Sequence, residues 1–255
     1  MFSETAPDAL SRRLLRAAYL SGFVAGLDAT SAFFIFPSVR DGLADGDAAA
    51  ASWLLTIVGI VSAAVLLQAG RMADRIGHNH LLVVSAVGAT ATALLAAGAP
   101  TLELLIIAKG VQAGCLAGLG VSSIAILVRE TPAPKLATAL GIWAFWTATS
   151  GVLGPVLSSL LVDLASWRLM FVATALFSAL VLWLGWPGLH VDFQPTERAP
   201  VDWPGTLAAI GGLSLLVLTL LEANDWCWSS GRTAAGGVIG IVLVAVVVLR
   251  SRNAL

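Results

Sequence analysis

The sequence predicts an all-α integral membrane protein with about eight transmembrane helices, and two observations lead to that prediction. The first is composition: of the 255 residues, 58% are hydrophobic and 11% are charged, and the mean hydropathy is +0.91. A water-soluble globule of this size could not bury so much apolar surface. The second is the length of the apolar stretches, about 17–25 residues each, which is what a helix needs to cross about 30 Å of hydrocarbon.

Eight such stretches follow one another along the chain, and none alternates apolar and polar residues as the strands of a membrane barrel do. The predicted spans are residues 14–37, 49–69, 81–99, 102–128, 136–162, 169–187, 204–222 and 234–250. A polar stretch with several prolines, residues 188–203, separates the sixth span from the seventh. We therefore expect a six-helix unit at 1–187 in two sets of three, a cytoplasmic linker at 188–203, and an additional helix pair at 204–255.

Each span has its own boundary signal. Acidic residues before the first span, and no small-residue cleavage site after it, indicate a helix that is retained. The second span ends at the charged segment 70–78, which predicts a short loop before the third span. Two residues separate the third span from the fourth. Charged residues precede the fifth, Trp167 and Arg168 precede the sixth, the linker precedes the seventh, and a tryptophan-rich loop at 226–228 precedes the eighth.

Basic residues predict the orientation, because cytoplasmic loops carry the excess of Lys and Arg. With the N-terminus in the cytoplasm, ten of these residues fall in inner segments and three in outer loops. The inner ones are Arg12, Arg13, Arg16, Arg71, Arg75, Arg129, Lys135, Arg198, Arg250 and Arg252, and the outer ones are Arg40, Arg168 and Arg232. We expect a multi-pass protein of the plasma or inner membrane with both termini in the cytoplasm. The net charge of −1 gives no reason to expect a nucleic-acid partner.

Two ionisable residues lie inside the spans at similar depth. Asp28 in the first span and Lys109 in the fourth are both roughly 10–14 Å from the outer end, so they are possible partners. Gln112 lies one turn inward of Lys109. Glycines repeat every fourth residue in the same two spans, at Gly22 and Gly26 and at 110, 114 and 118, which predicts close helix packing on a different face from Lys109.

Charges at that depth are costly and face protein or a water-filled cavity. Burial and a nearby ammonium act in opposite directions on the proton affinity of Asp28, so a change in their separation or hydration would bind or release a proton. A cationic substrate that competes for Asp28 would then be exchanged for a proton. The alternative is a buried structural ion pair, or a Lys109 side chain that extends outward to the interface.

Several segments in order resemble the major facilitator superfamily. Residues 70–78, GRMADRIGH, resemble its signature between helices two and three, with His78 at the position where a basic residue usually stands. Residues 109–114, KGVQAG, are similar to its fourth-helix motif, with Lys109 in place of arginine. Residues 150–159, SGVLGPVLSS, are similar to its fifth-helix antiporter motif, with serines replacing several glycines. Residues 27–37, 167–171, 202–205 and 226–228 are similar to the fourteen-helix drug:proton antiporter branch.

The resemblance implies a six-helix bundle built as a 3+3 inverted repeat, an additional two-helix hairpin, and export of small lipophilic or cationic compounds by proton antiport. It gives Asp28 the role of the proton-linked acid, and Lys109 and Gln112 that of the polar cavity wall. The residues that it implies for an inner gate are Gly70, Asp74, Arg75 and Gly77, and those for a tight bend in the fifth span are Gly151, Gly154 and Pro155. A basic inner loop can also serve only to set topology.

The resemblance also implies partners beyond the lipid bilayer, the small-molecule substrate and protons. Alternating access needs a second six-helix half, which we expect from a continuation of the chain, a second chain or a homodimer. A truncated or non-transporting membrane remnant or assembly subunit, and a metabolite uptake carrier of the same fold, are the alternatives. We expect no enzymatic activity, because no nucleophile, base and orienting acid lie close together. We expect no cofactor and no metal site, because the cysteines at 115 and 227 are too few and too far apart.

Overall fold

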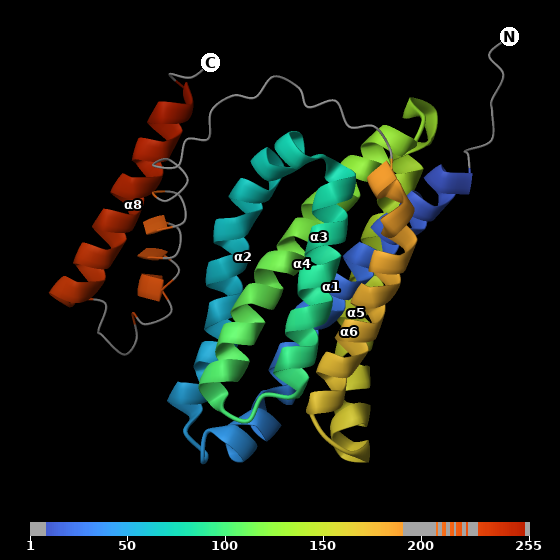
Figure 1. Ribbon diagram of the computed structural model, residues 1–255. Coiled ribbons are helices and arrows are strands. Elements are labelled where there is room, and N and C mark those ends of the chain that lie inside the picture. Colours follow the sequence, from blue (N-terminus) through green and yellow to red (C-terminus); the bar gives the residue numbers. More distant parts are fainter. Residues whose placement is uncertain are drawn as a thin grey trace, which may run out of the picture.

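The computed structural model describes residues 9–190 and 229–252, together with isolated residues between 208 and 223 (Figure 1). These residues are almost entirely helical. The elements are α1 (Ala9–Leu43), α2 (Ala48–Ile76), α3 (His78–Ala97), α4 (Leu102–Glu130), α5 (Ala133–Leu164), α6 (Arg168–Gly185), the 3₁₀ helix η1 (Trp186–His190) and α8 (Gly231–Arg252). Within the described part, six helices are long and apolar enough to cross a membrane. The predicted all-helical membrane fold is confirmed.

The first six predicted spans each correspond to one helix, α1 to α6, and the eighth corresponds to α8. Most of the seventh span, and residues 191–203 of the predicted linker, lie outside the described residues. The described residues of the seventh span are helical and pack on α8. A Cβ on Gly236 would meet the Thr219 hydroxyl, and a Cβ on Gly240 would lie 2.6 Å from Leu216. The division into a bundle, a linker and a helix pair stays a prediction.

The helices begin and end where local side chains satisfy the backbone groups that a helix end leaves open. At the start of α2, the Asp47 carboxylate accepts hydrogen bonds from Ala49 N at 2.9 Å and Ala50 N at 3.1 Å. Thr101 caps α4 in the same way, accepting from Leu104 N at 3.4 Å. Asp and Thr are favoured at this position because their side-chain oxygens replace the missing intrahelical acceptor.

The loop predicted at 70–78 is wrong in its extent, because α2 continues through Gly70 to Ile76 and α3 begins at His78. The segment contains no proline, and its Arg, Met and Ala residues favour a helix, so α2 continues past the apolar part of its sequence. The helix ends at Gly77, where φ is 91° and ψ is 144°. That backbone conformation is open to glycine and strained for other residues. The turn between α2 and α3 is therefore a single residue.

The six helices pack as two equivalent sets of three, in which α1, α2 and α3 correspond to α4, α5 and α6. The α1 helix packs on α5 as α4 packs on α2, and α1 packs on α6 as α4 packs on α3. The two remaining large interfaces, α1 with α4 and α3 with α6, join equivalent helices of the two sets. This is the contact pattern that a 3+3 repeat requires, and it places α1 and α4 next to each other in the bundle.

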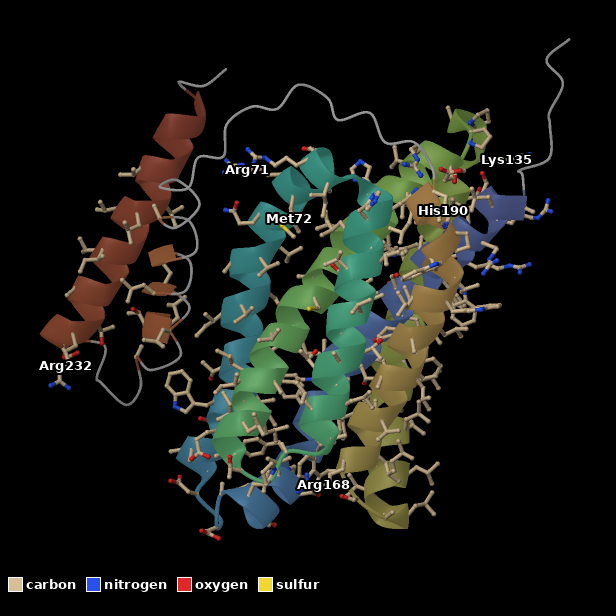
Figure 2. All side chains as sticks on the ribbon, in the orientation of Figure 1. Arg71, Met72, Lys135, Arg168, His190 and Arg232 are labelled. Carbon is tan, nitrogen blue, oxygen red and sulfur yellow. The ribbon has the colours of Figure 1, made fainter. Side chains whose placement is uncertain are left out.

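Charged residues of the predicted inner segments gather at one end of the bundle. Figure 2 shows Arg71, Lys135 and His190 at this end, which we call the basic end, and Arg168 at the opposite end. Each of the three comes from a different helix terminus, namely the last turns of α2, the start of α5 and the end of η1. The distribution agrees with the predicted arrangement of loops along the chain.

Candidate functional site

The two ionisable residues predicted within the spans form an ion pair between α1 and α4. The Lys109 Nζ donates a hydrogen bond to Asp28 Oδ1 at 2.6 Å. Lys109 is 0% exposed and Asp28 is 2% exposed. In contrast, the Arg40–Asp41 and Arg129–Glu130 pairs lie near helix ends and are partly exposed. The structure thus brings together the acid and the ammonium that the sequence places at equal depth.

The sequence analysis missed Phe171, which is the third member of this site. Phe171 lies on α6, is buried, and its ring centroid is 5.2 Å from Lys109 Nζ. An ammonium at this distance from a phenyl face is attracted by the ring quadrupole, and the attraction is stronger where water is excluded. No spacing rule in the sequence indicates which side of α6 points toward Lys109. Lys109 is therefore held by a carboxylate from α1 and a ring from α6.

Aromatic contacts continue from Phe171 to the end of the bundle opposite the basic end. Phe171 packs edge-on against Trp167 with ring centroids 6.0 Å apart, and the Arg168 guanidinium lies 4.3 Å from the Trp167 ring centroid. Arg168 Nη1 in turn donates to the carbonyls of Ala97 at 3.2 Å and Ala99 at 2.8 Å. The first of these belongs to the last turn of α3, whose carbonyls have no intrahelical donors. A basic side chain suits that helix end.

Gln112 is fully buried on α4, one turn from Lys109. Neither its amide nitrogen nor its amide oxygen has a hydrogen-bond partner among the described residues. Leaving a buried amide unsatisfied costs about 1–3 kcal/mol, so such groups in native proteins usually meet water, a ligand or a further chain. The site therefore contains a donor and an acceptor with capacity to bind a polar group.

Small residues allow α1 and α5 to approach closely beside the ion pair. A Cβ on Gly22 would lie 2.6 Å from Thr147 Oγ1, and a Cβ on Gly26 would lie 2.9 Å from the Thr147 carbonyl. Facing them from α5, a Cβ on Gly154 would meet the Thr30 hydroxyl and lie 3.3 Å from the Leu27 carbonyl. The close packing predicted for the glycines of the first span is thus present, and Gly154 contributes to it.

The glycines of α4 pack on other neighbours than Lys109 does, as predicted. A Cβ on Gly110 would lie 2.9 Å from Ile57 and one on Gly114 would lie 3.3 Å from Val65, both on α2, while Gly118 faces Ser85 of α3. The glycine face of α4 therefore serves packing, and the Lys109 face serves the site.

The remaining residues of the predicted antiporter motif differ from Gly154 in their surroundings. A Cβ on Gly151 would meet nothing within 4 Å, and Pro155 lies inside α5, which continues without a break from Ala133 to Leu164. Because proline has no N–H, the Gly151 carbonyl lacks its normal intrahelical donor. The predicted bend role of Gly151, Gly154 and Pro155 stays a prediction.

We expect Gly154→Ala to destabilise the protein by about 1–3 kcal/mol, because an extra methyl group in a closely packed interface forces backbones apart. Gly141→Ala on the same helix is the matched control, since a Cβ at that position would meet nothing within 4 Å. Alanine is a better helix former than glycine, so this control is expected to be neutral or slightly stabilising. Thermal unfolding in detergent, followed by circular dichroism, separates the two. Equal midpoints for both variants would contradict the close contact.

The predicted gate residues lie apart from the ion pair. Asp74 and Arg75 are exposed on the last turn of α2, near the basic end, whereas Asp28 and Lys109 are buried between α1 and α4. Gly70 lies within α2 and a Cβ there would meet nothing within 4 Å, and Gly77 forms the turn. The gate role of these four residues stays a prediction.

A second polar network at the basic end was missed by the sequence analysis. Ser11 of α1 donates to Glu130 Oε2 at 2.6 Å, and Arg129 Nη2 lies 2.8 Å from Glu130 Oε1. The same Arg129 nitrogen donates to Asn79 Oδ1 at 3.1 Å, and Asn79 Nδ2 donates to the Gly188 carbonyl at 3.0 Å. The network joins α1, α3, α4 and η1. Its members are distant in sequence, and only the fold brings them together.

In the described part of the chain, no three His, Cys, Asp or Glu side chains come close enough together to hold a metal ion.

The chain is similar to known proteins over most of its length. The family model described as Major Facilitator Superfamily matches residues 18–249. The chain is 26% identical over 235 residues to the probable multidrug resistance protein EmrY of Escherichia coli (strain K12), covering 91% of this chain and 44% of that protein. It is 28% identical over 244 residues to the multidrug resistance protein Stp of Mycobacterium tuberculosis (strain CDC 1551 / Oshkosh), covering 94% and 45%.

Solved structures of peptide transporters share the fold. The chain is similar to the peptide transporter POT in complex with sulfate, with a TM-score of 0.65 and 18% identity, over 96% of this chain and 52% of that one. The POT family transporter PepTSo gives a TM-score of 0.68 and 14% identity, over the same shares. The chain spans about half the length of the curated relatives that it matches.

Proposed function

This chain belongs to the major facilitator superfamily, and on that premise we propose that it supplies one six-helix half of an exporter that exchanges small lipophilic or cationic compounds for protons. Similarity to the probable multidrug resistance protein EmrY and to the multidrug resistance protein Stp supports export of such compounds. The energy source would be a proton gradient, and the transported compound would bind near the middle of the bilayer between two halves.

The buried Asp28–Lys109 ion pair is the observation on which the proposal rests. Two charges removed from water are stable only while they remain paired, so breaking the pair without compensation is strongly unfavourable. A proton on Asp28 neutralises the carboxylate and releases Lys109, and a cationic compound near Asp28 competes with both Lys109 and the proton. Binding of the compound and binding of the proton would therefore exclude each other, which is the requirement for antiport.

The second half of the transporter would pack against α2 and α5. In each of these two helices, only 17% of the 18-residue apolar stretch is buried within the bundle, against 50% in α1, α3 and α4. Both helices contact the rest of the bundle mainly through one neighbour, α4 or α1. Their exposed faces are available for a second bundle, while Gln112 and the ion pair lie on the helices between them. We propose that the chain acts in the plasma or inner membrane with both termini cytoplasmic, as the positive residues at the basic end favour.

Transport in inside-out vesicles tests the proposal. Vesicles from cells that express the complete gene product are given an acidic interior, and accumulation of a lipophilic cationic dye such as ethidium is followed by fluorescence. We expect the pH gradient to drive accumulation, and Asp28→Asn to abolish this proton-driven component, because an amide cannot take up a proton. Glu103→Gln is the control, since Glu103 is an exposed carboxylate in the first turn of α4, and it is expected to retain accumulation.

Two outcomes would contradict the proposal. Proton-driven accumulation that survives in Asp28→Asn would remove Asp28 from coupling. Substrate movement only under the opposite gradient would indicate an uptake carrier of the same fold.

A further inference from the structure

The surface between α1 and α6 near the basic end contains a groove of about 360 Å³. It is lined by Arg13 of α1 and by Ala179, Leu182, Trp183, Trp186 and Pro187 of α6 and η1. Trp183 is 63% exposed and Trp186 is 53% exposed. The groove lies outside the ion-pair site and has no part in the proposed transport cycle. Tryptophan and arginine together are typical of the level at which lipid headgroups meet acyl chains.

Arg13 is fixed in this groove by a gap in the hydrogen bonding of α6. The Trp183 carbonyl would normally accept from the N–H of the residue four positions later, but that residue is Pro187, which has no N–H. Arg13 Nη2 donates to the Trp183 carbonyl at 3.1 Å instead, and its guanidinium lies 4.9 Å from the Trp183 ring centroid. A guanidinium has five N–H donors. The side chain is thus held in place by one of these donors, and the residues that the structure describes offer no protein acceptor to the other four.

The groove has a net positive charge among the residues that line it. Within the described part of the chain, no carboxylate pairs with Arg13. Arg16 lies three positions further along α1, on the neighbouring helix surface, and is exposed. The other five lining residues carry no charge. A ligand of this groove would therefore combine an anionic oxygen group with an apolar part, and it would lie at the membrane interface.

We propose that the groove binds the phosphodiester headgroup of an anionic phospholipid, with Arg13 donating to the phosphate oxygens and the two tryptophans contacting the glycerol region and the upper acyl chain. Basic pockets between membrane helices are known to hold such headgroups. Arginine suits the role better than lysine, because its planar fork can donate two parallel hydrogen bonds to one phosphate. The apolar lining favours a lipid over a free anion, which would lose hydration without gaining an apolar contact.

Native mass spectrometry of the purified full chain in dodecyl maltoside tests the proposal by lipid titration. Dioleoyl phosphatidylglycerol is added in one series and dioleoyl phosphatidylcholine in another, and the dissociation constant of the first bound lipid is measured. We expect phosphatidylglycerol to bind at least about fivefold more tightly than phosphatidylcholine, since one basic group near a headgroup contributes about a factor of five. Arg13→Gln is expected to remove most of that preference, and Arg13→Lys part of it.

Two further variants distinguish a specific loss of lipid binding at the groove from general damage to the folded protein. Arg71→Gln removes the same charge from an exposed position at the basic end (Figure 2) that is outside the groove, and it is expected to keep the preference. Ala179→Phe fills the groove while Arg13 and the Trp183 carbonyl remain, and it is expected to lose the preference. If Arg71→Gln lowers the preference as much as Arg13→Gln does, only diffuse charge attraction is at work. If millimolar inorganic phosphate displaces the lipid completely, the site binds a free anion. Either result overturns the proposal.

Discussion

Replacing Lys109 with methionine is expected to lower the free energy of unfolding by about 3–5 kcal/mol, because it leaves the Asp28 carboxylate buried without a partner. Methionine has a volume close to that of lysine, so packing around the position changes little. The cost then reflects the isolated charge and not a cavity. Asp28 would have to take up a proton or draw in water to remain buried, and either change weakens the contact between α1 and α4.

A double-mutant cycle separates this effect from general damage. We expect Asp28→Leu combined with Lys109→Met to recover wild-type stability to within about 1 kcal/mol, or to exceed it, because replacing a buried ion pair with apolar residues is often neutral or stabilising. Unfolding by titration with sodium dodecyl sulfate, monitored by tryptophan fluorescence, gives the four free energies. If the double variant is as unstable as the sum of the singles, the two residues do not interact in the membrane. Transport by the double variant is expected to be absent even where stability is restored.

Phe171→Ala is expected to cost about 3–5 kcal/mol, since it removes a fully buried ring and leaves a cavity. Phe171→Leu keeps most of the apolar volume and is expected to cost less, about 0.5–2 kcal/mol, from loss of the ring face toward Lys109. The two substitutions therefore divide the contribution of Phe171 into packing and attraction for the ammonium. The same detergent unfolding measures both.

Coupling between Phe171 and Lys109 is tested by repeating the leucine substitution in the Lys109→Met background. We expect the cost of Phe171→Leu to shrink there, because the ammonium that the ring attracts is gone. Phe177→Leu is the control: Phe177 lies on the same helix and packs edge-on against Phe23, with ring centroids 5.4 Å apart. Its cost is expected to be equal in both backgrounds. A Phe171 cost that does not depend on residue 109 would remove the ring from the site.

Much of the fold follows from the sequence, because lipid imposes one strong constraint. Every backbone group inside the hydrocarbon needs an internal partner, so apolar stretches of membrane length become helices. That reasoning locates α1 to α6, but it cannot locate their ends. Residues 70–76 include three charged side chains and are predicted from the sequence to lie in a loop, whereas α2 continues through them until Gly77, because leaving the membrane does not end a helix. At this position the helix ends because Gly77 adopts a positive φ of 91°.

The candidate site was predictable in part for a similar reason. Depth along a helix can be counted in residues, and so the sequence could place Asp28 opposite Lys109. Rotation about each helix axis and the choice of neighbours depend on packing across the whole bundle. The sequence could not assign Phe171 to the ion pair, Arg13 to the Trp183 carbonyl, or Arg129 to Asn79. Each of these contacts joins segments that are far apart in the chain.

The polar bridges at the two ends of the bundle have a mechanical consequence. At the basic end, Ser11, Glu130, Arg129 and Asn79 connect helices from both sets of three. At the other end, Arg168 of α6 donates to the carbonyl of the last residue of α3 and to the carbonyl of Ala99 just after it. These hydrogen bonds tie the two sets of three helices to each other at both ends of the bundle. We expect the six helices to move together, as one rigid body, in any change of shape.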